Sequence, residues 1–127
     1  MREIRVATAQ FENRDNDPEF NLSRIRELSR RAVDQGAEIV SFHEGCIPGY
    51  TWLQPLSREQ LQDVAEPVPD GPSTKRLIEI AREFSTVVMA GLCELDKKGN
   101  VFNCYVTVSP DGFITKYHKL HTFVNPH

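Results

Sequence analysis

The strongest constraint on the fold comes from a series of apolar, β-branched runs at residues 87–95, 101–109 and 113–119. The runs read VVMAGLCEL, VFNCYVTVS and FITKYHK, and only DKKGN and PDG separate them. Such short, Gly-containing links are typical of β-hairpins, because two parallel strands need a much longer crossover. The last third of the chain is therefore predicted to form antiparallel strands joined by hairpin turns.

The first third has a different pattern, in which strand and helix signals alternate. Residues 4–10 (IRVATAQ) alternate apolar with polar or small side chains, which predicts a strand with one face in the core. A helix should follow, because Asp17 suits an N-cap, Pro18 suits the first helical position and Gly36 supplies a stop. Its apolar face comprises Leu22, Ile25, Leu28, Ala32 and Val33. The run AEIVSF (37–42) then predicts a buried strand, joined to the first through the helical crossover.

The middle of the chain connects these two parts. Residues 43–56 contain Pro48, Gly49 and Pro55 and are predicted to form a loop. Ser57 begins the capping-box-like sequence SREQ of a short helix. The turn PDGPS (69–73) leads into a second amphipathic helix, whose apolar face carries Leu77, Ala81 and Phe84. The order of elements predicts an α/β fold with an α+β mixed sheet and helices packed on one face.

Composition and charge limit the class of protein. The chain has 127 residues, 39% hydrophobic and 26% charged, which suits one domain with its own core. Its 15 basic and 18 acidic residues are scattered, so no basic stripe indicates a nucleic-acid partner. The longest apolar stretch, 87–93, is too short to cross a bilayer, and the N-terminus lacks the apolar core of a signal peptide. A cytoplasmic location with no membrane partner is therefore expected.

Two residues near strand ends are candidates for chemistry. Glu44 lies just beyond a predicted buried strand, where α/β folds place ligand and catalytic groups. A carboxylate there could serve as a general base, or it could be an ordinary solvated loop residue. Lys119, in KYHKLH, ends a strand-like segment, and a buried lysine there could stabilise an oxyanion. A lysine at a strand end is more often solvated, so position alone leaves both roles open.

The cysteines offer a possible nucleophile. Cys46 lies two residues after Glu44, and a thiolate beside a base suits covalent acyl transfer. Catalytic partners meet in space, however, and neighbours in a Gly-containing loop can point in different directions. Cys93 and Cys104 fall within strand patterns, where cysteine behaves as a small core residue. The odd number of cysteines without CxxC spacing indicates reduced thiols instead of a disulfide framework or zinc knuckle.

The histidines do not form a recognisable metal motif. His43 precedes Glu44 in a loop, which is neither HExxH nor helical. His118 and His121 lie on an extended segment and are expected to face opposite sides. No metal site and no cofactor are predicted.

Several segments, in order along the chain, carry a family resemblance: VATAQF, FHEGCIPGY, PDGPSTKRLIEIARE, AGLCEL, VFNCYVTVSPDG and KYHKLHTF. Together they resemble the nitrilase or carbon-nitrogen hydrolase superfamily. The resemblance implies an αββα four-layer sandwich, of which this chain would form the N-terminal part, and subunits that form homodimers or higher homo-oligomers. The single domain of residues 1–127 is accordingly expected to be truncated at its C-terminus.

The resemblance also assigns roles within a Glu-Lys-Cys triad. Glu44 matches the general base and Lys119 the catalytic lysine, whereas His118 stands where arginine is common and His43 where proline is common. Cys46 matches an ordinary loop position. In the family the nucleophilic cysteine follows the lysine on a later strand, so it is expected to lie beyond this chain.

The function implied by the resemblance is that of an amidase or nitrilase type of carbon-nitrogen hydrolase. A cysteine thioester would form from a small-molecule amide, N-carbamoyl compound or nitrile, with Glu44 as general base and Lys119 as oxyanion stabiliser. The 127 residues alone would be inactive. The alternative is a non-enzymatic half-domain that associates with itself or with a partner, because missing sandwich layers would leave an exposed apolar patch.

Overall fold

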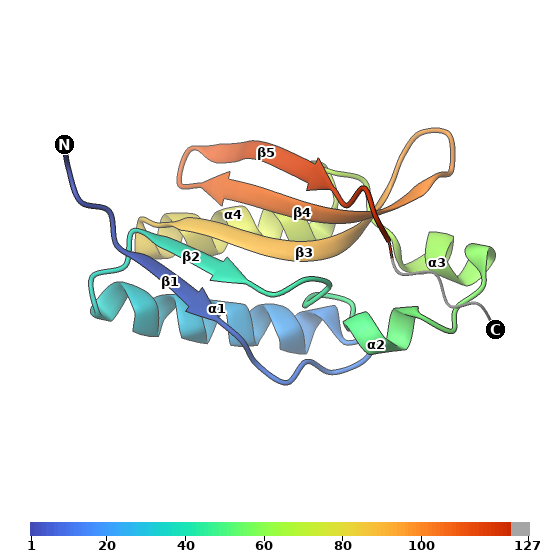
Figure 1. The fold of residues 1–127 in the computed structure, drawn as a ribbon, viewed down its shortest axis with the longest axis horizontal. Coiled ribbons are helices and arrows are strands. Elements are labelled where there is room, and N and C mark those ends of the chain that lie inside the picture. The colour runs from blue at the N-terminus through green and yellow to red at the C-terminus, as the bar shows by residue number, and fades with distance from the viewer. Residues whose placement is uncertain (123–127) are drawn as a thin grey trace.

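The computed structural model describes residues 1–122 as one mixed sheet with two long helices on one of its faces and two short helices at its end (Figure 1). The strands lie in the order β1 (Val6–Ala9), β2 (Ile39–Phe42), β3 (Val87–Leu95), β4 (Val101–Ser109) and β5 (Gly112–His118). The first three are parallel, and β4 and β5 continue the sheet by antiparallel pairing. The mixed sheet predicted from the sequence is therefore confirmed.

The helices begin where the sequence signals indicated. Helix α1 (Pro18–Asp34) starts after Asp17, whose carboxylate accepts a hydrogen bond from the Phe20 N–H at 2.9 Å. Ser57 and Gln60 form the predicted capping box of α3 (Arg58–Val64). Helix α4 (Pro72–Phe84) follows the predicted turn. None of the helices in residues 1–122 is long and apolar enough to cross a membrane.

One helix was not predicted. The segment 43–56 was expected to be a loop throughout, but it contains the short helix α2 (Tyr50–Leu53). A single turn of four residues is too short to show a helical period of apolar side chains. Gly49 precedes it and supplies no side-chain cap, so the usual start signal is also missing.

The core lies between the sheet and the two long helices. Alternate residues of each strand point toward the helices, as the two-residue period of a strand requires. Burial of these apolar side chains is the main stabilising contribution. The fully or almost fully buried side chains include Ile25 of α1, Leu77 and Ile80 of α4, and Val40, Val88, Val106 and Val108 of the sheet.

The opposite face of the sheet is more open. Ile39, Met89 and Tyr105 are only half-buried there, and Val6 and Tyr117 are 57% and 58% exposed. This open face carries a mixture of aromatic, aliphatic and polar groups, and it is the face on which the candidate site lies.

Gly91 of β3 lets the loop after β2 lie directly on the sheet. A Cβ atom at this position would lie 2.3 Å from the Gly45 nitrogen and 3.0 Å from the Glu44 Cα. The Ile47 N–H donates to the Gly91 carbonyl at 3.2 Å, which holds the loop in this place. Any side chain at residue 91 would therefore displace the backbone that carries Glu44.

We expect Leu77→Ala to destabilise the 127-residue chain by about 2–5 kcal/mol, because it removes a fully buried side chain and leaves a cavity. Leu120→Ala is the matched control, since Leu120 is 77% exposed, and it should change stability by less than about 0.5 kcal/mol. Urea unfolding of both variants measures the difference. Equal effects would contradict the assignment of the core.

Gly91→Ala should lower the free energy of unfolding by about 1–3 kcal/mol, because the added methyl group overlaps the loop backbone. It should also shift the amide NMR signals of residues 44–47. A variant with the parent's stability and unchanged loop signals would show that the close approach is not required.

Candidate active site

Glu44 and Lys119 meet on the open face of the sheet. The Lys119 Nζ donates a hydrogen bond to Glu44 Oε1 at 2.7 Å, across 75 residues of sequence. Glu44 follows the carboxyl end of β2, and Lys119 directly follows β5. Their side chains are 40% and 34% exposed, so the ion pair remains in reach of solvent and of a small ligand.

Strand directions explain this meeting. Because β4 is antiparallel to both β3 and β5, strand β5 runs in the same direction as β2 and β3. The carboxyl ends of these three strands therefore lie at the same edge of the sheet. That is the edge at which α/β folds assemble ligand and catalytic groups.

Asn103 of β4 holds both members of the pair. Its Nδ2 donates to Glu44 Oε1 at 2.6 Å, and its carbonyl accepts from the Lys119 N–H at 2.9 Å. Both side-chain donors thus converge on Oε1 of the carboxylate. Oε2 takes no hydrogen bond from any residue in the described range 1–122, so it remains available to accept a proton.

A hollow of about 200 Å³ opens beside the pair and is lined by Glu44, Asn103, Tyr105, Tyr117 and Lys119. The Tyr105 hydroxyl donates to the Phe42 carbonyl at 2.6 Å, which fixes the tyrosine against β2. Burial raises the pKa of Tyr105, so its hydroxyl stays protonated.

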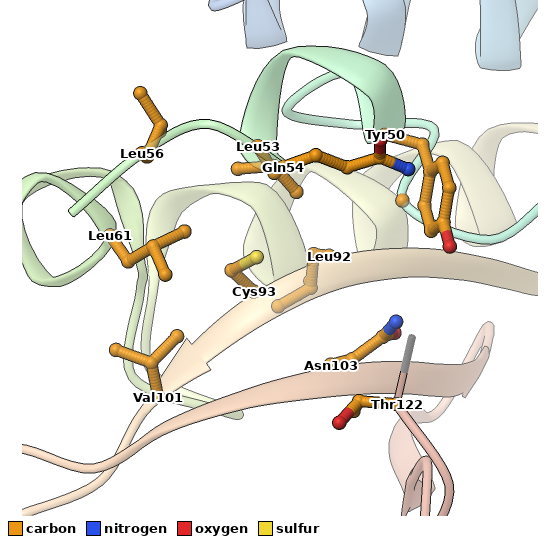
Figure 2. A pocket seen from close by; sticks show the side chains of 11 residues that line it. Tyr50, Leu53, Gln54, Leu56, Leu61, Leu92, Cys93, Val101, Asn103 and Thr122 are labelled. Carbon is orange, nitrogen blue, oxygen red and sulfur yellow. The ribbon is translucent and has the colours of Figure 1, made fainter. Parts of the chain in front are cut away.

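A second cavity of about 290 Å³ is shown in Figure 2. It shares the lining residue Asn103 with the first hollow. In Figure 2, Tyr50 and Leu53 lie on the α2 side of this cavity, and Val101 and Asn103 lie on the β4 side. Most of the other lining side chains are apolar, among them Leu56, Leu61 and Leu92. An apolar group attached to a ligand at Glu44 would find suitable surroundings in this cavity.

Glu44 stabilises the positive charge of Lys119. The hydrogen bond from Lys119 to Glu44 raises the pKa of Lys119, and the charge of the carboxylate adds to the effect. Lys119 therefore remains an ammonium ion at neutral pH. The carboxylate of Glu44 has one oxygen that can accept a proton. The ammonium group of Lys119 beside it can stabilise a developing oxyanion.

None of the three cysteines contacts the Glu44–Lys119 pair: Cys46 and Cys104 lie in the core, and Cys93, which is 8% exposed, lines the cavity of Figure 2. Cys46 is completely buried, its Sγ lies 3.7 Å from the Gly91 carbonyl oxygen, and burial raises its pKa to about 12. Burial likewise raises the pKa of Cys93 to about 11. For Cys104, burial and then the charge of Glu94 raise the pKa to about 12. The prediction that Cys93 and Cys104 are core residues is confirmed.

The histidines are also not brought to the pair. His43 packs edge-on against Phe11, with ring centroids 5.0 Å apart, and burial lowers its pKa. His118 faces Glu94 on the other side of β5, and His121 is exposed. His127 lies outside the described residues.

Sequence reasoning missed Asn103, Tyr105 and Tyr117. The signal available was an asparagine in the middle of a predicted strand, two residues before a tyrosine and therefore on the same face. Nothing in the sequence indicated that this face would meet Glu44, because that contact depends on the pairing of β3 with both β2 and β4.

Comparisons with known proteins agree with the resemblance seen in the sequence. Residues 5–127 match the carbon-nitrogen hydrolase family. A nitrilase of Pyrococcus abyssi is 35% identical over 121 residues, which cover 94% of this chain and 44% of that protein. The omega-amidase NIT2 of Bos taurus is 35% identical over 124 residues, which cover 97% and 42%. The chain therefore spans less than half the length of these relatives.

Solved structures show the same fold. An amidase from Nesterenkonia sp. superposes with a TM-score of 0.75 at 22% identity, over 96% of this chain and 44% of that one. An N-terminal amidase with an Asn-Glu-Ala peptide superposes with a TM-score of 0.80 at 19% identity, over 94% and 29%. These structures share the fold of the chain, and the family match over residues 5–127 shows that this chain belongs to the carbon-nitrogen hydrolase family.

Proposed function

We propose that the protein containing this chain hydrolyses carbon-nitrogen bonds of small amides, N-carbamoyl compounds or nitriles, with Glu44 as general base and Lys119 as oxyanion stabiliser. The observation that carries the proposal is the 2.7 Å contact between Lys119 Nζ and Glu44 Oε1 beside an open hollow. Family membership supports the reaction class. The two roles rest on the geometry of the pair and on the family resemblance.

The chemistry begins with a cysteine thiol, whose proton Glu44 Oε2 accepts. The thiolate attacks the substrate carbon, and the Lys119 ammonium stabilises the negative charge that develops on an amide oxygen. The carbon-nitrogen bond then breaks, and the amine leaves with the proton that Glu44 returns. Water then attacks the thioester carbon while Glu44 accepts its proton, the carbon-sulfur bond breaks to release the carboxylic acid, and Glu44 returns the proton to the leaving thiolate.

The nucleophile is proposed to come from outside the 127 residues. Cys46, Cys93 and Cys104 are buried, and their raised pKa values keep them protonated at neutral pH. None of them is therefore a suitable thiolate nucleophile. We accordingly expect the 127-residue chain to be inactive without the sequence that supplies a cysteine beside Glu44. The three free thiols also favour a reducing compartment such as the cytoplasm.

Amides are the favoured substrates within this range. Both solved neighbours described above are amidases, and one of the relatives is an omega-amidase. The apolar cavity next to Asn103 would accept an uncharged substituent of the amide.

A second candidate function is association without catalysis, as a homodimer or a higher homo-oligomer. The exposure of Val6 and Tyr117 on the open sheet face favours it, because such residues commonly become buried against a partner. Glu44 is required for hydrolysis in an enzyme but not for association of a half-domain. Substitutions at Glu44 therefore separate the two functions.

Glu44→Gln should lower the pKa of Lys119. The carboxylate raises this pKa by accepting a hydrogen bond and by its charge, and glutamine removes the charge. NMR titration of the Lys119 Hε and Cε signals measures the change. Glu59→Gln removes an equal charge on α3 and should leave the titration of Lys119 unchanged, whereas equal effects of both variants would contradict the contact.

In the protein that includes the downstream sequence, Glu44→Gln and Lys119→Met should each reduce amide hydrolysis by about 10²–10⁴-fold. Glu59→Gln is the control and should retain parental activity. The 127-residue chain should show no turnover. Turnover by that chain, with loss of activity in Cys46→Ser, would instead identify Cys46 as the nucleophile.

A further inference from the structure

A buried carboxylate lies on the other face of the sheet from the candidate site. Glu94 of β3 is only 3% exposed, yet both of its oxygens are occupied by basic groups of β5. Lys116 Nζ donates to Oε1, and His118 Nε2 lies 2.6 Å from Oε2. Burial opposes ionisation of Glu94, but the bonds from Lys116 and His118 outweigh it and lower its pKa. Glu94 therefore bridges β3 and β5 across β4.

The two faces of β5 have different contacts. Lys116 and His118 are two residues apart and share one face, which the sheet register places beside the buried residues Val106 and Cys104. Tyr117 and Lys119 belong to the other face and line the hollow beside Glu44. The strand is thus held on one face while it presents Lys119 on the other.

Within residues 1–122, strand β5 pairs only with β4, and beyond His118 its backbone is held by the hydrogen bond from the Lys119 N–H to the Asn103 carbonyl, which does not by itself fix the direction of the side chains. It is an edge strand with no neighbour beyond it within the described residues, and its residues 114–117 are exposed. Its register with β4 shifts between Thr107 and Val108. The last paired residue is His118, whose ring stacks on Phe102 with centroids 4.1 Å apart. A slip of one residue would move every side chain of β5 to the opposite face and turn Lys119 away from Glu44.

We propose that Glu94 is a positioning residue, which binds Lys116 and His118 and so directs the side chain of Lys119 toward Glu44. This inference rests on the proposed function only for the role of Lys119 as oxyanion stabiliser. The contact between Lys119 and Glu44 can be followed without any activity.

A metal site is the competing interpretation of the same residues. Glu94, Cys104 and His118 bring oxygen, sulfur and nitrogen atoms within 4.8 Å of one another, a set of donors that zinc accepts. Lys116 already supplies a positive charge to Glu94, however. Zinc would have to displace this lysine and also take the proton of the Cys104 thiol, whose pKa burial and the charge of Glu94 raise to about 12. The contacts therefore fit an ion-pair clamp better than a metal site.

The test compares Glu94→Ala and Lys116→Met with the parent by NMR titration of Lys119 in the 127-residue chain. Both variants should lower the pKa of Lys119, in the direction expected for Glu44→Gln, because the lysine loses its partner. A direct charge effect has the opposite sign for Lys116→Met, since removal of a nearby positive charge favours the charged form of Lys119. The double variant Glu44→Gln/Glu94→Ala should show no further decrease.

Two control variants complete the comparison. Lys116→Arg keeps a cation beside Glu94 and should preserve the Lys119 titration. Glu83→Gln removes a surface carboxylate that pairs with Arg26 and should also have no effect. Urea unfolding establishes that each variant is folded, and if Glu94→Ala does not fold, Lys116→Met carries the test because Glu94 retains His118.

Folded Glu94→Ala and Lys116→Met proteins with the parent's Lys119 titration would overturn the proposal. Stoichiometric Zn²⁺ binding that Cys104→Ser abolishes would also overturn it, in favour of a metal site. In the protein with its downstream sequence, Glu94→Ala should lower kcat by about 10²-fold with KM near the parental value. A lowered Lys119 pKa in a protein without amide hydrolysis would leave positioning intact and contradict the proposed function.

Discussion

Burial of one face of the sheet beneath α1 and α4 is the constraint on which the other features of this chain depend. The parallel strands β1, β2 and β3 are adjacent and in order, so each crossover moves in the same direction across the sheet. Crossovers of one hand that move in one direction place their helices on the same face. The apolar residues of both helices then pack against that face, and the other face stays open.

The open face acquires its chemistry from strand direction. Two successive hairpin turns return β5 to the direction of β2 and β3, so a residue after β5 reaches the same edge as a residue after β2. Gly91 lets the loop with Glu44 descend onto this edge, and Asn103 bonds to both Glu44 and Lys119. Each of these contacts depends on the register of a central strand, which the core packing determines.

The two charged clusters of this sheet occupy different environments. The Glu44–Lys119 pair is partly exposed, so water and small molecules reach it, and one carboxylate oxygen has no donor within residues 1–122. Glu94 is buried, and both of its oxygens are bonded, which makes its removal costly and its geometry well defined. The two clusters lie on opposite faces of the sheet, and β5 contributes to both, with Lys116 and His118 to the buried cluster and Tyr117 to the hollow beside Glu44.

Local signals in the sequence were sufficient for the start of α1 at Asp17, the capping box at Ser57 and the hairpin turns, because each depends on residues close together in the chain. Position after a strand made Glu44 and Lys119 candidates, and the family resemblance favoured them. Helix α2 was not predicted, because a single helical turn is too short to show a periodic pattern in the sequence. Asn103 and Glu94 were not identified, because their partners are 59, 22 and 24 residues away. The sequence by itself thus determined the elements and their order, whereas only the tertiary structure decided which side chains meet, because strand pairing and register set those distances.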